Sequence, residues 1–143
     1  MEIICTQPRR LAAINIAKRI AQELNEPVGQ RVGYQVGMES MASERTQITF
    51  MTTGIFLMRL VNNPKSLNTC THIILDEVHE RDLDIDFSMV VIKHLLAKTE
   101  DQDESKKFKL ILMSATFNTE LFANYFAKLS IKNVEKVKVY EGV

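Results

Sequence analysis

The stretch THIILDEVHERD, from Thr71 to Asp82, decides the fold expected for this chain. Its first part, His72–Leu75, is apolar and β-branched without a turn residue, which is typical of a strand buried on both faces. Asp76 and Glu77 follow directly, although an ionised carboxylate is costly to bury without a partner. Either these charges form a solvated loop, or they lie at the carboxyl end of a sheet strand, where open α/β sheets bind ligands.

The composition is that of a soluble globular domain. Of 143 residues, 45% are hydrophobic and 25% charged, and the formal net charge is zero, so nucleic-acid binding would need a local basic patch. The apolar runs are too short for a membrane span or a signal peptide. Cys5 and Cys70 lie beside apolar strands and are predicted to be buried thiols in an intracellular compartment, cytoplasm or nucleus, rather than a disulfide or zinc site.

Strand and helix patterns alternate along the chain, which predicts the α/β class with a mostly parallel sheet and helices on both faces. Strands are expected at residues 2–6, 31–36, 46–52, 72–75, 108–116 and 134–140, and helices at 11–24, 54–63, 84–98 and around 119–129. Gly33 and Gly37 are expected where the backbone is tight.

Three polar clusters follow apolar strands: TQPRR at Thr6–Arg10, DEVH at Asp76–His79 and SAT at Ser114–Thr116. A parallel sheet would bring them together along one edge. Asp76 could then hold Mg²⁺, directly or through water, against nucleotide phosphates, while Glu77 orients or polarises the attacking water. The alternative for this acidic pair is a solvated helix cap.

Two further segments suit phosphate. Arg9 and Arg10 precede a helix start, and guanidinium groups and free backbone N–H groups both bind phosphate oxygens. The segment TTG at Thr52–Gly54 opens another helix and offers hydroxyl and backbone donors. The alternatives are exposed surface arginines and an ordinary helix cap.

Taken together, TQPRR, TTG, DEVH followed by ER, and SAT resemble the superfamily 2 helicases, and most closely the DEAH-box/RNA helicase A group. The stretches CTQPRRLAA and DEVHERD separate the chain from the DEAD-box group. The resemblance covers almost the whole chain. It implies that residues 1–143 are part of the first of two RecA-like domains, from the TQPRR motif through the SAT motif.

The resemblance implies ATP, or another NTP, and Mg²⁺ as cofactors. In that reading Asp76 helps to hold Mg²⁺, Glu77 acts on the hydrolytic water, and His79 communicates with the nucleotide and the second domain. Ser114 and Thr116 would couple the nucleotide state to strand movement.

The implied partner is single-stranded RNA. The matching residues would touch its backbone, so that binding is largely independent of sequence. They are Thr6, Arg9, Arg10 and Thr52.

Three positions depart from the commonest pattern of the group. Val78 stands in place of Ala, Thr53 in place of Asp, and Gly37 in place of Arg. These features resemble a Tudor-containing, spindle-E-like branch, and CTQPRRLAA is also similar to a YTH-containing branch. Both branches stay open.

No Gly-rich P-loop of the form G-x-x-x-x-G-K-[ST] occurs in the 143 residues, and the motifs of the second domain are missing as well. We therefore expect a RecA-like sheet that lacks the P-loop strand, begins after it in the chain and does not turn over nucleotide alone. The missing strand would leave a sheet edge exposed, from which we expect self-association or pairing with a strand supplied by a neighbour.

The leading hypothesis is part of the motor of an ATP-dependent RNA helicase or RNP-remodelling ATPase. A catalytically silent RNA-binding or scaffold module with the same fold is one alternative. A DNA translocase of the same superfamily is another, because phosphate contacts do not distinguish RNA from DNA while contacts to the 2′-OH do.

Overall fold

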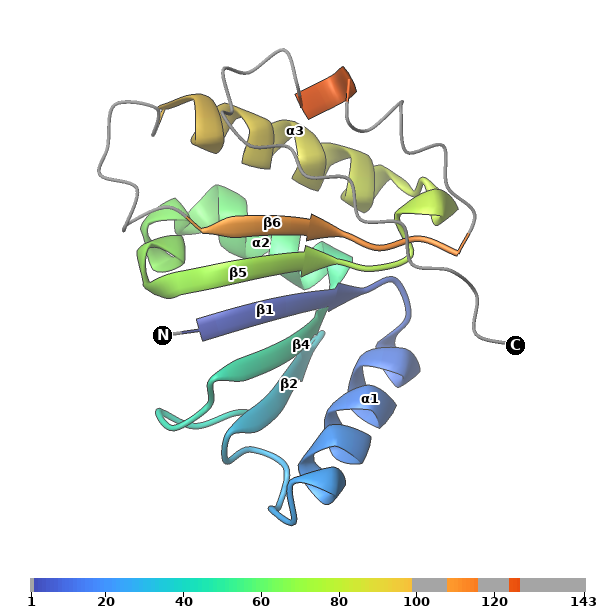
Figure 1. The fold of residues 1–143 in the computed structure, drawn as a ribbon, viewed down its shortest axis with the longest axis vertical. Helices are drawn as coiled ribbons and strands as arrows, with labels where there is room; N and C mark the ends of the chain where they lie inside the picture. The colour runs from blue at the N-terminus through green and yellow to red at the C-terminus, as the bar shows by residue number, and fades with distance from the viewer. Residues whose placement is uncertain (1, 99–107, 116–123, 127–143) are drawn as a thin grey trace.

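A single six-stranded sheet forms the centre of the protein. The computed structural model describes residues 2–98, 108–115 and 124–126, and its strand order is β3-β2-β4-β1-β5-β6 (Figure 1). Every neighbouring pair is parallel except β2 and β3. The strands are β1 (Glu2–Gln7), β2 (Val32–Val36), β3 (Glu39–Met41), β4 (Ile48–Thr52), β5 (Cys70–Leu75) and β6 (Lys109–Leu112).

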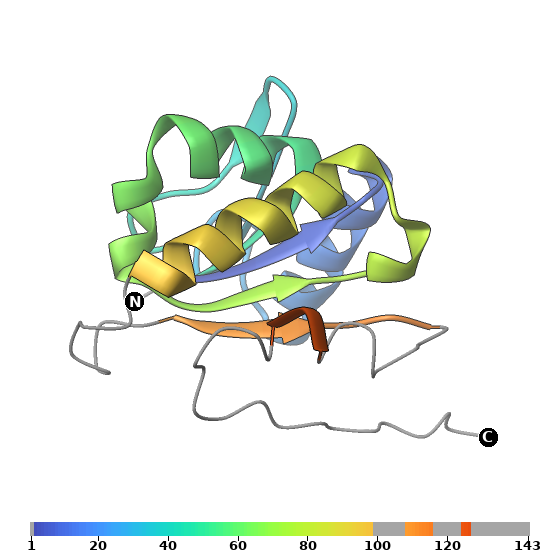
Figure 2. The same ribbon diagram turned by 90° about the horizontal axis from the view of Figure 1, so that it is seen from above.

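Helices cover both faces of the sheet. Helix α1 (Arg10–Glu23) packs on one face, whereas α2 (Thr53–Asn62) and α3 (Leu83–Lys98) lie on the other (Figures 1 and 2). Two 3₁₀ turns, η1 (Pro64–Thr69) and η2 (Val78–Glu80), complete the described elements. Successive strand side chains alternate between the two cores, so Ile4 packs with the α2–α3 core and Cys5 with the α1 core.

The predicted fold class is confirmed, as are the strands and helices expected between residues 2 and 98. One strand was missed: β3 is only three residues long and carries no recognisable alternation. The strand expected at 108–116 is shorter, and the expected elements near 119–129 and at 134–140 lie almost wholly outside the described residues.

The burial of β5 differs from the expectation of two covered faces. Ile73 and Leu75 are buried in the α2–α3 core, whereas Ile74 on the opposite face is only partly buried. The reason is the placement of α1, whose main contacts are with β2 and β4 rather than with β5.

Both glycines predicted to mark tight backbone do so. Gly37 has φ +54° in the turn that joins β2 to β3, a conformation that glycine adopts without strain. A Cβ at Gly33 would overlap the backbone carbonyl oxygen of Met41 across the hairpin. Glycine is therefore needed for the close approach of these two strands.

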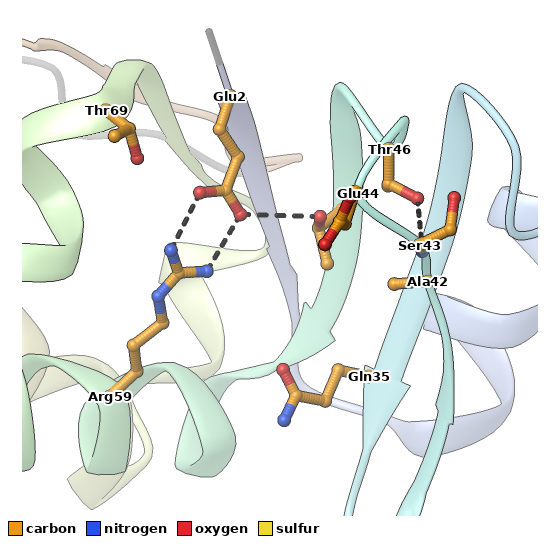
Figure 3. A pocket seen from close by; sticks show the side chains of 9 residues that line it. Glu2, Gln35, Ala42, Ser43, Glu44, Thr46, Arg59 and Thr69 are labelled. Carbon is orange, nitrogen blue, oxygen red and sulfur yellow. Dashed lines mark hydrogen bonds and ion pairs between the residues drawn. The ribbon is translucent and has the colours of Figure 1, made fainter.

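A half-buried ion pair ties the start of β1 to the last turn of α2. The guanidinium of Arg59 donates to both carboxylate oxygens of Glu2, at 2.8 and 2.7 Å (Figure 3). Burial by itself would raise the pKa of Glu2, but the hydrogen bonds and charge of Arg59 outweigh it and hold that pKa below its ordinary value. The pair borders a cavity of about 330 Å³ at the start of β1 (Figure 3).

Cys5 and Cys70 are buried free thiols, as predicted. Burial raises the pKa of each to about 12, so both stay neutral and unreactive at physiological pH. Within the described part of the chain, no helix has the length and apolar character needed to cross a membrane.

We expect Arg59→Met to lower the free energy of unfolding by about 2 kcal/mol, because it leaves the half-buried carboxylate of Glu2 without its charged donor. Urea unfolding at neutral pH would measure the loss. Arg19→Met is the matched control, since Arg19 pairs with Glu23 on the exposed surface of α1 and should matter little.

The pH dependence gives a second check on the same pair. A carboxyl group with a lowered folded pKa contributes stability that is complete above its unfolded pKa and is lost as pH falls through the folded pKa. The difference between wild type and Arg59→Met should therefore shrink in acid. A difference that stays constant from neutral pH to below the folded pKa of Glu2 would contradict the electrostatic origin.

Candidate functional site

The carboxyl ends of three adjacent parallel strands meet at one edge of the sheet. In Figure 1 the arrowheads of β1, β5 and β6 point to the same side. The register pairs Gln7 with Thr52 and Thr6 with Leu75, and Leu75 in turn pairs with Leu112. Thr6 and Gln7 begin the TQPRR cluster, Asp76 follows Leu75, and Ser114 lies two residues after Leu112, so the fold brings the start of each predicted polar cluster to this edge.

Asp76 is fixed at the end of β5 by two hydrogen bonds. Its Oδ1 accepts from the backbone N–H of Glu77 at 2.8 Å, and its Oδ2 accepts from Nε2 of Gln7 at 2.7 Å. Neither donor is charged, so these two hydrogen bonds set the orientation of the carboxylate without pairing it with a cation. The charge of Asp76, after burial, also contributes to the raised pKa of Cys5.

Glu77 occupies the left-handed region with φ +55°, which is uncommon for a residue with a long side chain. Its Oε2 lies 3.2 Å from Nδ1 of His79, although this buried nitrogen makes no hydrogen bond of good geometry with any described residue. The side chain of Glu77 is 39% exposed, so it can reach solvent beside the half-buried Asp76.

The loop after β5 is held by backbone hydrogen bonds to Met113, the residue that follows β6. Its Val78 N–H donates to the carbonyl of Met113 at 3.1 Å, and Met113 N–H donates to the carbonyl of Leu75 at 2.9 Å. These bonds join the DEVH segment to the residue before Ser114. Val78 itself is completely buried, which pins the turn to the α2–α3 core.

The far end of this loop is closed by the start of α3. Asp82 Oδ1 accepts from the N–H of Ile85 at 2.7 Å, the arrangement of an N-cap. Arg81, also left-handed with φ +48°, donates to both carboxylate oxygens of Asp86. Arg81 thus makes a salt bridge to the first turn of α3.

Both predicted phosphate-binding arginines face carboxylates. Arg9 donates to Oε1 of Glu80 at 3.2 Å, and Arg10 donates to Oε2 of Glu39 at 2.5 Å. Their side chains are 78% and 61% exposed, so both guanidinium groups remain open to a ligand. Hydrogen bonds from Tyr34 and then Arg10 hold the pKa of Glu39 below its ordinary value, so Glu39 is ionised at neutral pH.

The predicted threonines are placed differently. Thr6 is completely buried, and its hydroxyl has no hydrogen-bond partner among the described residues, so an RNA contact by this side chain is not favoured by the geometry. Thr52 is partly exposed at the start of α2, where its side chain makes no cap hydrogen bond. Ser114 follows β6 at the same edge, whereas Thr116 lies outside the described residues.

Two contacts of the candidate site were not predicted from the sequence. Gln7 lies inside the TQPRR motif but received no role, and only the register reveals that it faces Asp76. Glu39 sits on the missed strand β3, and it pairs with Arg10 across 29 positions of sequence. No local sequence pattern indicates either contact. A glutamine at the end of a buried strand is nevertheless unusual in itself.

The metal ligands present at this edge are few. No group of three or more His, Cys, Asp or Glu side chains that could hold a metal occurs in residues 2–98, 108–115 and 124–126. The cavity beside Glu2 lies at the opposite end of β1 and contains none of the predicted site residues. A cation at the predicted site would therefore depend on Asp76 together with water and ligand oxygens.

The chain is similar in sequence to known proteins. The DExH-box ATP-dependent RNA helicase DExH3 of Arabidopsis thaliana is 48% identical over 124 residues, covering 87% of this chain and 10% of that protein. The probable ATP-dependent RNA helicase spindle-E of Culex quinquefasciatus is 48% identical over 124 residues, covering 87% and 8%. The ATP-dependent RNA helicase TDRD9 of Danio rerio is 41% identical over 139 residues, covering 97% and 10%.

The chain thus spans about a tenth of the length of these relatives. Spindle-E proteins are among them, as the resemblance implied, but plant DExH proteins match equally well, so the branch stays a prediction.

A solved structure supports the same assignment. The crystal structure of the E. coli DExH-box NTPase HrpB matches with a TM-score of 0.74 and 32% identity, over 89% of this chain and 15% of that one. The sequence profile described as DEAD/DEAH box helicase matches residues 1–123. On these grounds the chain belongs to the DEAD/DEAH box helicase family.

Proposed function

We propose that this chain is part of the first RecA-like motor domain of an ATP-dependent RNA helicase. The observation that carries the proposal is the direct hydrogen bond between the TQPRR and DEVH segments, from Gln7 to Asp76. It joins a segment with two exposed arginines to a segment with two acids. If ATP hydrolysis is to change the affinity of a protein for nucleic acid, its hydrolytic and nucleic-acid-binding residues must be connected in this way.

The acidic segment suits Mg²⁺-assisted chemistry. Asp76 offers one oriented, half-buried carboxylate, and Mg²⁺ commonly takes one or two carboxylates while water and phosphate oxygens supply the rest. A bound Mg²⁺ would neutralise charge that develops on the phosphates during transfer. Asp76 would hold it, and Glu77, exposed beside Asp76, would orient the attacking water.

His79 is placed to respond to changes at Glu77. Its Nδ1 lies 3.2 Å from Oε2 of Glu77, so a change in the hydrogen bonding or charge of Glu77 would be felt directly by the imidazole ring. We propose that His79, with Ser114 and Thr116, communicates the nucleotide state to the rest of the motor. The backbone bonds between Val78 and Met113 give a route between the two segments.

RNA would be gripped through its phosphates. Arg9 and Arg10 are exposed, neighbouring cations, and the start of α2 beside Thr52 adds backbone donors. Both arginines already carry an acidic partner, so phosphate must compete with Glu80 and Glu39 for them. The setting we propose for this activity is intracellular, in the cytoplasm or the nucleus.

The chain alone is expected not to hydrolyse ATP, because its 143 residues contain no P-loop lysine and Gly-rich backbone cradle for the phosphates. A parent protein that supplies the P-loop and the second domain should hydrolyse ATP faster with single-stranded RNA. Glu77→Gln should lower that stimulated rate by about two orders of magnitude or more, because the amide cannot accept the proton of water. Steady-state turnover with and without RNA measures this.

Glu44→Gln is the matched control, because Glu44 borders the cavity near Glu2 and is remote from the proposed site. It should hydrolyse ATP like the wild type. A parent protein that folds and binds RNA but shows no turnover would overturn the motor function and favour a silent RNA-binding scaffold.

The arginines predict a specific response to charge changes. In the parent protein, Arg9→Gln and Arg10→Gln should each weaken RNA binding and lower the slope of log affinity against log salt by about one. Glu39→Gln should strengthen binding by roughly twofold to fivefold, because it removes the competitor for Arg10. Fluorescence anisotropy with a labelled single strand at several salt concentrations measures both effects.

Arg19→Gln provides the control, since Arg19 lies on α1 but pairs with Glu23 instead of facing the sheet edge. If Arg19→Gln weakened RNA binding as much as Arg10→Gln, RNA would bind over the general basic surface rather than at this sheet edge. Equal affinity for DNA and RNA strands, with equal stimulation by both, would favour the DNA translocase instead.

We further propose that β6 is an open sheet edge. Among the described residues β6 pairs with β5 alone, and it carries the exposed apolar side chain of Ile111. The chain by itself should therefore self-associate, or accept a strand from a neighbour, and Ile111→Lys should reduce this. Light scattering after size exclusion measures the mass; Met58→Lys, at an exposed site on α2, is the control.

A monomeric chain at high micromolar concentration would contradict this expectation. So would an equal effect of the two lysine substitutions, because that would indicate general surface stickiness rather than pairing along β6.

A further inference from the structure

Gln7 is a buried polar side chain between the two halves of the proposed site. Only 3% of its surface is exposed, and its amide Nε2 donates to Oδ2 of Asp76 at 2.7 Å. Its backbone carbonyl accepts from the hydroxyl of Thr53, in the TTG segment, at 3.4 Å. One residue thus contacts both the acidic loop and the start of α2.

The register of the sheet brings these two residues together. Thr6 pairs with Leu75 in the parallel ladder of β1 and β5, so the following residues, Gln7 and Asp76, lie side by side. In adjacent strands such neighbours project from the same face at a strand spacing of about 4.8 Å. Pro8 follows and keeps Gln7 in an extended conformation, so the side chain cannot turn away with a helix start.

The chemistry of the contact fits a carboxylate that must bind a cation. A half-buried carboxylate needs hydrogen-bond donors, and an arginine or lysine would supply them but also neutralise the charge. A glutamine amide supplies a donor without a charge. Asp76 is therefore oriented by Gln7 and by the Glu77 N–H, and neither of these donors brings a positive charge that would compete with Mg²⁺.

We propose that Gln7 is a positioning residue that holds Asp76 in the orientation required for Mg²⁺ and thereby links the RNA-facing segment to the nucleotide. This inference rests on the proposed motor function. It assigns Gln7 no contact with RNA or with phosphate. Its effect is exerted wholly through Asp76.

The test is a double-mutant cycle in the parent protein, with Gln7→Met, Asp76→Asn and the double variant. Methionine has nearly the shape of glutamine but no donor. The readout is binding of a fluorescent ATP analogue at increasing Mg²⁺ concentration, followed without turnover. Gln7→Met should raise the Mg²⁺ concentration needed for half-saturation by about tenfold, the usual scale for loss of a partner of a metal ligand.

The cycle separates positioning from a general structural effect. If Gln7 acts through Asp76, adding Gln7→Met to Asp76→Asn should change the Mg²⁺ requirement no further. RNA affinity without nucleotide should stay within about twofold of wild type, because the arginines are untouched. Gln35→Met on β2 is the control, since Gln35 faces the cavity near Glu2 and should not affect Mg²⁺ (Figure 3).

Gln7→Glu is the second variant, to be used if methionine impairs folding. It is isosteric, and its carboxylate would repel Asp76, so the Mg²⁺ requirement should change by more than threefold while circular dichroism stays native.

Several results would overturn the inference. An unchanged Mg²⁺ requirement in a folded Gln7 variant would do so, and so would additive effects in the double mutant. If the wild-type parent itself bound nucleotide without any need for Mg²⁺, the proposed function would fail and this inference with it. If the wild-type parent requires Mg²⁺ and Gln7→Met has the same Mg²⁺ requirement, the positioning role of Gln7 is excluded while the proposed function stands.

Discussion

The parallel register of β1 between β4 and β5 is the constraint on which the rest of the site depends. It places the ends of the three strands level, so Gln7 lies beside Thr52 on one side and Asp76 on the other. A shift of one residue would turn every side chain of β1 to the opposite face, moving Ile4 and Cys5 out of their separate cores and Gln7 away from Asp76. The apolar packing of both faces therefore fixes the geometry of the polar edge.

The charged side chains at that edge have two kinds of partner. The cations Arg9 and Arg10 are exposed and face exposed or partly exposed acids, an arrangement that costs little to break in water. Asp76 is instead held by uncharged donors in a half-buried setting. In the proposed function the first kind of contact would be exchanged for a phosphate, while the second would leave a carboxylate available to a cation. Burial and donor charge would then distinguish the proposed RNA-binding residues from the proposed catalytic ones.

How much of this could be predicted follows from which interactions are local in sequence. The apolar run His72–Leu75 and the 3.6-residue pattern of α1 and α3 are local, and they were identified correctly. The convergence of TQPRR, DEVH and SAT at one edge followed from the parallel rule alone. The partners Gln7–Asp76 and Arg10–Glu39 were missed, because they depend on strand register and on the short hairpin strand β3, which leave no periodic trace. Partial coverage of β5 was missed for a similar reason, since the position of α1 over the sheet is a tertiary property.

The turn between Glu77 and Arg81 links the proposed catalytic acid to the proposed RNA-binding arginine. Both of its ends are left-handed residues other than glycine, so the turn has a defined geometry that its neighbours must maintain. Its members face in two directions: His79 lies against Glu77, and Glu80 reaches Arg9. Proximity alone is not coupling, which requires an element with two arrangements that both ligands bias. In the function proposed here the two arrangements would be Arg9 paired with Glu80 and Arg9 paired with a phosphate. A phosphate bound by Arg9, as proposed above, would release Glu80, and the turn that carries Glu80 is the same turn that begins at Glu77.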